Sequence, residues 1–453
     1  MENSDAAGFG AENQVTNGPG GRILTNCAVW SPDSQWIVYD TRSDAAGDRF
    51  NGVSIERVHC ETGEVRRLYE SRNGAHCGVA TCDPHLDRVV FILGPEHPAP
   101  DWQYGPSHRQ GVLVSAALPG VSVNLEARDL TPPLTPGALR GGTHVHVFSP
   151  DGEWVSFTYN DALLPSSALE AELCEPDQRN IGVSVPLGPV AVRSDHPRNQ
   201  SGTYFSVLVT RTTARPRLGS DDIMQALEEG WVGVAGYVQH GGTRQHRALA
   251  FQGQVTDAQG EAFWEVFLVD LPEDVTVASL EGPLEGTLTQ RPLPPLGTRQ
   301  RRLTHTENRK YPGIQGPRHW LRSSPDGESI AFLMRDELGA AQIWTISPRG
   351  GEPHQITHDL WGVASAFTWN PNGQLIAYAA DNSVFIVEAA TGVSRRLTPR
   401  SSDADAPLPL ACVFSPSGEK IAFMRRLPDT LERDSPRSNH ICVVALRAYP
   451  DRH

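Results

Sequence analysis

The sequence has no apolar run approaching the roughly 20 residues that a membrane helix needs, which argues against a membrane span. Its first residues carry neither a basic start nor an apolar core, so a secretory signal is not expected and we predict a cytoplasmic protein. Basic side chains are also outnumbered, at 39 against 53 acidic ones, and the formal net charge is −14. This balance argues against non-specific nucleic-acid binding, which needs a basic field over the phosphates.

Several sequence motifs of catalysis and redox chemistry are missing as well. No CxxC pair occurs among the seven cysteines, and an odd number without a leader predicts reduced thiols. The chain lacks a G-x-S-x-G nucleophile elbow, a P-loop and a dinucleotide-binding glycine motif. These absences argue against a propeller-capped serine peptidase and against nucleotide chemistry. Lysine is nearly absent, so arginine supplies most of the positive charge; the two lysines are Lys310 and Lys420.

One short phrase recurs along the chain and indicates the fold. It consists of an apolar run, the residues S-P-D-G or a variant, and a second apolar run. Copies lie at 28–40, 146–159, 321–334, 367–380 and 412–425, with a degenerate copy at 79–93. Proline sets one turn dihedral, Asp or Asn bonds its own backbone, and glycine takes the positive-φ position. Because the flanking runs are β-branched and aromatic, each copy predicts a β-hairpin.

A second phrase, R-x-L-T or a variant, follows the hairpins and fits an outer strand, at 66–69, 128–131, 301–304, 354–357 and 395–398. Four short antiparallel strands per repeat of about 40–45 residues describe a propeller blade. We therefore predict that residues 1–453 form one all-β domain, a seven-bladed β-propeller. Its blades fall at about 22–70, 73–131, 139–213, 214–306, 310–358, 361–399 and 405–450. Six or eight blades remain possible, since the fourth repeat lacks the S-P-D-G turn.

The two ends of the chain suggest how the ring closes. Residues 13–16, NQVT, are an orphan copy of the outer-strand phrase, and we expect them to complete the seventh blade. Insertions are predicted at 94–111, 161–203 and 280–300, where long loops on a rigid scaffold could carry function. Residues 219–233 predict a short helix, with Ser220 as its N-cap, acidic residues in its first turn and an apolar face.

The repeats resemble the TolB-type propeller superfamily over nearly the whole chain. Five longer segments resemble the YidR-like family of bacterial proteins, at 139–154, 178–190, 206–212, 247–253 and 309–327. The superfamily also includes oligogalacturonate lyase, a seven-bladed propeller that holds a divalent metal mainly through histidines in its central channel. No motif matches closely enough to transfer that enzyme's residues, so the resemblance implies a shared architecture alone.

Histidines occupy matched places in the repeats. In a propeller, side chains a few positions before S-P-D-G converge at the end of the channel opposite that turn. His144 lies six residues before Pro150, and His319 lies six before Pro325. His146 is two residues beyond His144, which predicts the same strand face. We interpret these three histidines as ligands of a divalent metal, Mn, Zn or Ca, although structural histidines would give the same pattern.

Other polar residues are predicted at the same end of the channel. Arginine binds carboxylates through two parallel hydrogen bonds, so arginines at this end suit a small anionic carbohydrate. Candidate ligand-binding side chains are Arg140, Arg179, Gln315 and Trp102. Candidate catalytic side chains are three possible proton acceptors and a stabiliser of enolate-like charge, namely His76, His246 and Lys310 with Arg318.

Two functions therefore compete at the level of sequence. The first is a carbohydrate lyase that removes a proton next to a carboxylate or carbonyl and expels a β-leaving group with the help of a metal. The second is a non-catalytic propeller that binds a protein or a small anionic ligand. The first predicts polar groups concentrated in the channel, and the second predicts them on the insertion loops.

Overall fold

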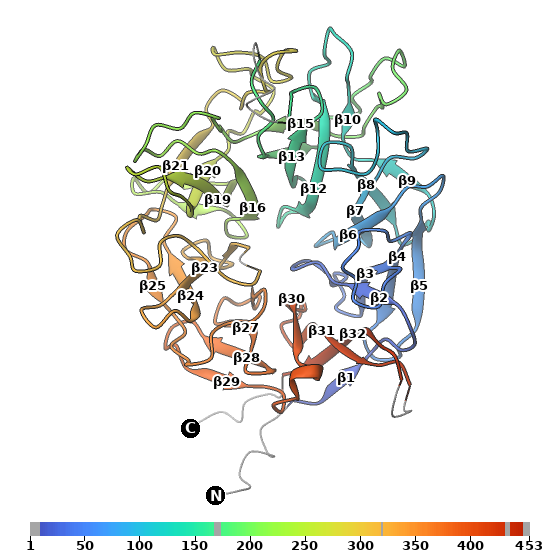
Figure 1. Cartoon of the computed structure of the whole chain (residues 1–453), viewed down its shortest axis with the longest axis vertical. Coiled ribbons are helices and arrows are strands. Elements are labelled where there is room, and N and C mark those ends of the chain that lie inside the picture. Colours follow the sequence, from blue (N-terminus) through green and yellow to red (C-terminus); the bar gives the residue numbers. More distant parts are fainter. Residues whose placement is uncertain (1–9, 167–173, 319, 431–434, 447–453) are drawn as a thin grey trace, which may run out of the picture.

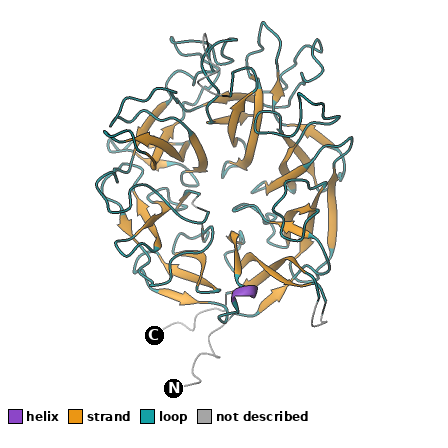
Figure 2. Ribbon diagram, viewed as in Figure 1, coloured by secondary structure: helices purple, strands orange, loops and turns teal. Residues whose placement is uncertain are grey.

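A computed structural model describes residues 10–166, 174–318, 320–430 and 435–446. Seven four-stranded sheets surround a central channel, as predicted (Figure 1). In each sheet neighbouring strands are antiparallel. Strand and loop account for nearly all of the described chain (Figure 2), and its one helix is a short 3-10 turn, η1 (Asp403–Asp405). No described helix is long and apolar enough to cross a bilayer.

The first four blades follow one another in chain order, and their strands run from the channel outwards. Blade one contains β2 (Gly21–Ile23), β3 (Trp36–Arg42), β4 (Ser54–His59) and β5 (Val65–Glu70). Blade two contains β6 (Cys77–Cys82), β7 (Arg88–Leu93), β8 (Gln110–Ser115) and β9 (Ser122–Asn124). Blade three contains β12 (Gly141–Phe148), β13 (Val155–Asp161), β14 (Asn180–Val185) and β15 (Phe205–Leu208). Blade four contains β16 (Ala226–Trp231), β19 (Ala248–Thr256), β20 (Ala262–Asp270) and β21 (Arg299–Arg302).

The last three blades complete the ring. Blade five contains β22 (Arg322–Ser323), β23 (Ile330–Arg335), β24 (Ala341–Ile346) and β25 (His354–Gln355). Blade six contains β26 (Thr368–Trp369), β27 (Leu375–Ala380), β28 (Ser383–Glu388) and β29 (Ser394–Arg396). Blade seven contains β30 (Pro407–Phe414), β31 (Lys420–Pro428), β32 (Arg437–Ala445) and β1 (Glu12–Gln14). Because β1 pairs with β32, the N-terminal strand closes the ring as predicted.

Two further strand pairs lie outside the blades. Strands β10 (Ala127–Arg128) and β11 (Ala138–Leu139) form a short parallel pair, and β17 (Tyr237–Val238) and β18 (Arg244–Gln245) form a small hairpin. The R-D-L-T phrase at 128–131 therefore begins in β10, and the outer strand of blade two is β9.

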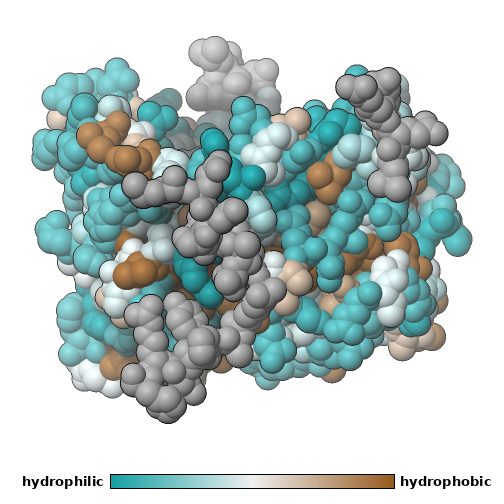
Figure 3. Space-filling model, turned by 90° about the horizontal axis from the view of Figure 1, so that it is seen from below, coloured by the Kyte–Doolittle hydropathy of each residue, from teal (hydrophilic) through white to brown (hydrophobic). Residues whose placement is uncertain are grey.

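The hydrophobic core lies mainly between adjacent blades. Successive side chains along a strand point to opposite faces of its sheet. Each face therefore packs against the neighbouring blade on that side. The face shown in Figure 3 is mainly hydrophilic, with apolar patches between the hydrophilic areas. The ring is therefore held together mainly by contacts between neighbouring blades.

Blade four departs from the sequence prediction. The helix expected over 219–233 is wrong, because residues 226–231 form β16, the innermost strand, paired with β19. Its polar residues include Glu228 and Glu229, which favour a solvent-facing helix in the sequence, yet Glu229 is only 1% exposed. Strand β19 is the second strand of the blade and not the first, so the residues before it lie at the other end of the channel from the one predicted.

The innermost chain segments of blades one to four share a backbone irregularity. In each of these segments, one non-glycine residue has a positive φ, two or three residues before the segment ends at its turn. These residues are Ala28 (51°), Val79 (57°), Val145 (51°) and Glu228 (58°). In β6, β12 and β16 the pairing register shifts at this point. Such bulges reorient the side chains on either side of them, and backbone strain of this kind gathers at functional sites.

Candidate binding site at the polar end of the channel

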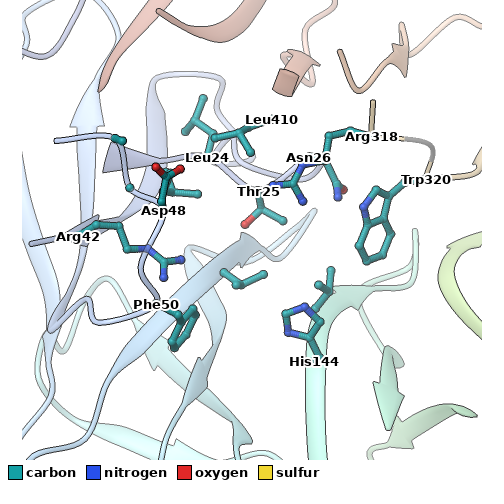
Figure 4. Close-up of a pocket in the computed structure, with 15 residues that line it drawn as sticks. Leu24, Thr25, Asn26, Arg42, Asp48, Phe50, His144, Arg318, Trp320 and Leu410 are labelled. Carbon is teal, nitrogen blue, oxygen red and sulfur yellow. The ribbon is translucent and has the colours of Figure 1, made fainter. Parts of the chain in front are cut away.

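A cavity of about 330 Å³ opens at the end of the channel where the innermost strands begin, and we call it the polar mouth. Its walls come from blades one, two, three and seven and from the segment leading into blade five. The side chains that give it its character are Asn26, Arg42, His144, Arg318 and Trp320, which Figure 4 shows around one cavity. This is the end at which the sequence predicted that residues upstream of S-P-D-G would meet.

His144 stands in β12 immediately before the bulge at Val145. The imidazole is half-buried, and its Nδ1 atom is buried without a hydrogen-bond partner. Burial lowers the pKa of His144 well below its usual value, and the positive charges of Arg109, Arg179 and Arg318 lower it further. The imidazole is therefore neutral at pH 7 and keeps a free ring nitrogen.

The three arginines around His144 share an unusual feature. Arg109 donates to the Tyr104 hydroxyl (3.3 Å), and Arg179 donates to the Asn160 side-chain oxygen (3.3 Å). In the described part of the chain, none of Arg109, Arg179 and Arg318 forms an ion pair with a carboxylate. A protein with net charge −14 thus holds three guanidinium groups outside ion pairs near one neutral imidazole.

Arg42 is held differently, by a buried carboxylate. Asp40 lies 2.6 Å from Arg42 Nε and accepts the Val79 backbone N–H at 2.8 Å, so it also fixes the bulge of blade two. Burial raises the pKa of Asp40 to about 6 in spite of the adjacent guanidinium. The Arg42 guanidinium lies over the Phe50 ring, 4.3 Å from its centroid. Arg42 is thereby a fixed part of the wall.

His146 does not join His144 in the cavity. The bulge at Val145 breaks the two-residue alternation, so His146 faces the interior between blades two and three. Its Nε2 lies 2.6 Å from Glu126 Oε1, and the side chain has no exposure. The expectation that both histidines share one strand face is therefore wrong.

A divalent metal does not fit the described wall of the polar mouth. Among the described residues that line the polar mouth, His144 is the one histidine. His146 is bonded to Glu126, and His319 lies outside the described residues. Among the described residues, no three His, Cys, Asp or Glu side chains come close enough to hold a metal ion. Cationic arginines around His144 would repel a metal ion further.

Some predicted site residues lie elsewhere in the fold. Arg140 is 1% exposed and pairs with Asp161 (2.7 Å), while its other nitrogens donate to the carbonyls of Thr287 and Gln290. It therefore anchors the 280–300 loop to blade three and does not line the polar mouth. His246 precedes β19, the second strand of blade four, and lines a separate cavity with Arg247. Arg247 pairs with the S-P-D-G turn of blade three, so His246 lies at the opposite end of the channel.

The remaining candidates also lie outside the wall of the polar mouth. Lys310 is exposed and donates to the Glu337 carbonyl (3.1 Å), and Gln315 donates to the Pro312 carbonyl (2.7 Å). Trp102 stacks on His108, with centroids 3.8 Å apart. His76 directly precedes β6, and its Nδ1 is buried without a partner. Of the predicted side chains, His144 and Arg318 therefore line the polar mouth. Arg179 lines a separate cavity with Asn160 and Asp177, and its charge still acts on the pKa of His144.

The opposite end of the channel has a different chemistry, and we call it the apolar mouth. It is a cavity of about 280 Å³ bounded by the S-P-D-G turns of several blades. Its walls contain the aromatic residues Trp30, Phe148, Trp231 and Phe414. Three of them directly precede the first residue of the S-P-D-G turn or its variant, so an aromatic residue at this repeat position is a sequence signal of this cavity.

The comparisons with known proteins place the chain in a family. It is 47% identical over 417 residues to the protein named "uncharacterized protein YidR" of Escherichia coli K12, covering 91% of this chain and 95% of that protein. The chain belongs to the YidR family. A family model described as a protein of unknown function, DUF3748, matches residues 76–200 of this YidR family member.

Solved structures support the fold assignment of this family member. Oligogalacturonate lyase in complex with manganese aligns over 99% of this chain and 96% of its own, with a TM-score of 0.51 and 11% identity. The oligogalacturonate lyase of Vibrio parahaemolyticus gives a TM-score of 0.50 at 11% identity, with the same coverage. At such low identity, the likeness shows a shared propeller architecture alone.

Proposed function

We propose that this YidR family member binds a small carboxylated sugar in the polar mouth and acts on it by a lyase-type elimination. The observation that supports the proposal is the set of three guanidinium groups, without carboxylate ion pairs in the described structure, around a neutral imidazole. Guanidinium groups recognise carboxylates through paired, charge-assisted hydrogen bonds. The architecture shared with oligogalacturonate lyase adds support at the level of fold.

The residues suit particular roles in this reaction. Arg318, in the wall of the polar mouth, would hold the substrate carboxylate and stabilise the negative charge that develops when the neighbouring carbon loses its proton. His144 would accept that proton on its neutral ring. The bond from the β-carbon to the leaving oxygen then breaks, a carbon–carbon double bond forms, and the leaving oxygen takes up a proton. No oxidant, reductant or water molecule is consumed.

Bound carboxylate would also help His144 to act as a base. A negative charge beside the three arginines offsets their effect on the imidazole, and this raises the pKa of His144 in the complex. Substrate binding and proton acceptance would therefore support each other at this site.

Elimination can be followed by the ultraviolet absorbance of the new double bond, with oligogalacturonides as the probe. The wild-type protein is expected to produce this signal, and His144→Ala and Arg318→Gln are each expected to lose it. Arg349→Gln is the matched control, since Arg349 pairs with Glu328 away from the polar mouth. A wild-type protein that binds the acid without producing the double bond would contradict the lyase role and support the binding propeller.

A further inference from the structure

The apolar mouth lies on the other side of the channel from the proposed sugar site. Its walls come from six blades, and the residues at the turn ends of the innermost segments form them. The two tryptophans donate their indole N–H groups to the adjacent blade, Trp30 to the Val413 carbonyl and Trp231 to the Val147 carbonyl, both at 3.0 Å. Because these polar atoms are already bonded, the rings present apolar surface to the cavity.

A single charged side chain stands among the described residues that line this cavity, and it is Arg322 of β22. Its Nη1 donates to the Leu321 carbonyl (2.8 Å), and its Nη2 donates to Asn26. Its Nε is buried and has no hydrogen-bond partner in the described structure. A buried guanidinium N–H without an acceptor is costly, so an acceptor supplied by a ligand would stabilise it.

The floor between the two mouths is polar. Asn26 lines the polar mouth and binds Arg322, while Cys27 and the Glu229 carboxyl lie close enough to Arg322 and to each other for their charges to interact. The Arg322 side chain therefore lies at the base of the apolar mouth, and the aromatic residues lie towards the S-P-D-G face. A ligand with an apolar body and one anionic end would complement this lining.

We propose that the apolar mouth binds a small aromatic carboxylate, with its ring among Trp30, Phe148, Trp231 and Phe414 and its carboxylate at Arg322. Charge complementarity with Arg322 fixes the anionic end, and the aromatic walls favour a planar ring by stacking and edge contacts. A cavity of about 280 Å³ has room for one ring with a short side chain. This second site is independent of the proposed sugar chemistry.

Calorimetric titration with cinnamate and its neutral amide tests this site. The wild-type protein should bind cinnamate, and the amide about tenfold more weakly, because the amide lacks the charge that Arg322 recognises. Arg322→Gln should weaken cinnamate binding by about tenfold and leave the amide unaffected. Arg349→Gln should behave like the wild type, since it lies outside this cavity.

Three outcomes would overturn the proposal. The first is the absence of cinnamate binding up to millimolar concentrations, and the second is equal binding of acid and amide by the wild type. The third is competition by galacturonate, or loss of cinnamate binding in Arg318→Gln, because either would locate the aromatic acid in the polar mouth. The acid-to-amide comparison uses the wild-type protein, so the test holds even if Arg322→Gln fails to fold.

Discussion

The two ends of the channel are made by the same innermost segments, yet their chemistry is opposite. The polar mouth gathers Arg42, His144 and Arg318 where these segments begin. The apolar mouth gathers Trp30 and Phe148 where they end. The difference arises because the residues before the turns pack against the next blade, whereas the residues at the other end lie beside the insertion loops. The residues before the turns thus contribute more to the stability of the ring, and the two ends offer ligands different chemistry.

The largest expected effect is a difference between the two ends of the channel in how much a substitution lowers the stability of the protein. Phe148 is 5% exposed and packs with Val90 and Val155, so Phe148→Ala should lower the free energy of unfolding by about 3 kcal/mol. Arg318 has no hydrogen bond or ion pair among the described residues. Arg318→Ala should therefore change the free energy of unfolding by less than about 0.5 kcal/mol. Chemical denaturation of both variants checks this, and equal losses would remove the distinction between the mouths.

A smaller effect concerns the floor between the mouths. Burial raises the pKa of Glu229 to about 7, and its Oε1 has no hydrogen-bond partner. Since the folded state binds this proton more tightly than the unfolded state, stability is lost as the pH rises from about 4.5 through about 7. Glu229→Gln should therefore raise the free energy of unfolding by about 2 kcal/mol at pH 8.

The matched control for that variant is Glu261→Gln, because Glu261 is exposed at the end of the β19–β20 hairpin. Compared with the wild type, Glu229→Gln should have a higher free energy of unfolding on the alkaline side only. An identical pH dependence in Glu229→Gln and the wild type would show that the carboxyl is already ionised and stabilised in the folded protein.

The smallest expected effect is the acid sensitivity of the polar mouth. The pKa of His144 is lowered in the folded state, so the unfolded state binds the proton more tightly. Stability contributed by the neutral imidazole is present above the unfolded pKa, near 6.5, and is lost as the pH falls below it. The thermal midpoint of His144→Gln should fall less between pH 7 and pH 5 than that of the wild type. Parallel curves would contradict the neutral state of the half-buried His144 imidazole.

The fold is predictable because the turn phrase repeats with its own local physics. Proline, Asp or Asn, and glycine together define the hairpin in blades three, five and six, and partial copies mark blades one and seven. The innermost strand of blade four is not predicted because it is not followed by that turn. It also carries Glu228 and Glu229, which favour a helix when taken alone. Burial against blade three, where Thr158 donates to Glu229 (3.1 Å), determines the strand instead.

The site is predictable only in part. The repeat offset predicts the position of His144, and Arg318 is predicted as the neighbour of His319; the structure places both His144 and Arg318 in the wall of the polar mouth. Strand alternation fails for His146, because nothing in the residues around Val145 signals its positive φ. Arg109 is missed because it lies within the 94–111 insertion, and only the folded ring brings it towards His144. Local patterns thus predict which strand end a residue occupies, whereas bulges and insertions decide where its side chain points.

The polar mouth as a carboxylate site is the central claim, and its most direct test is calorimetric titration with galacturonate and galactose. We predict that the wild type binds galacturonate and discriminates against galactose, and that Arg318→Gln weakens galacturonate binding by about tenfold. Arg349→Gln should bind like the wild type. Equal affinity for the acid and the neutral sugar, or unchanged binding in Arg318→Gln, would contradict the claim.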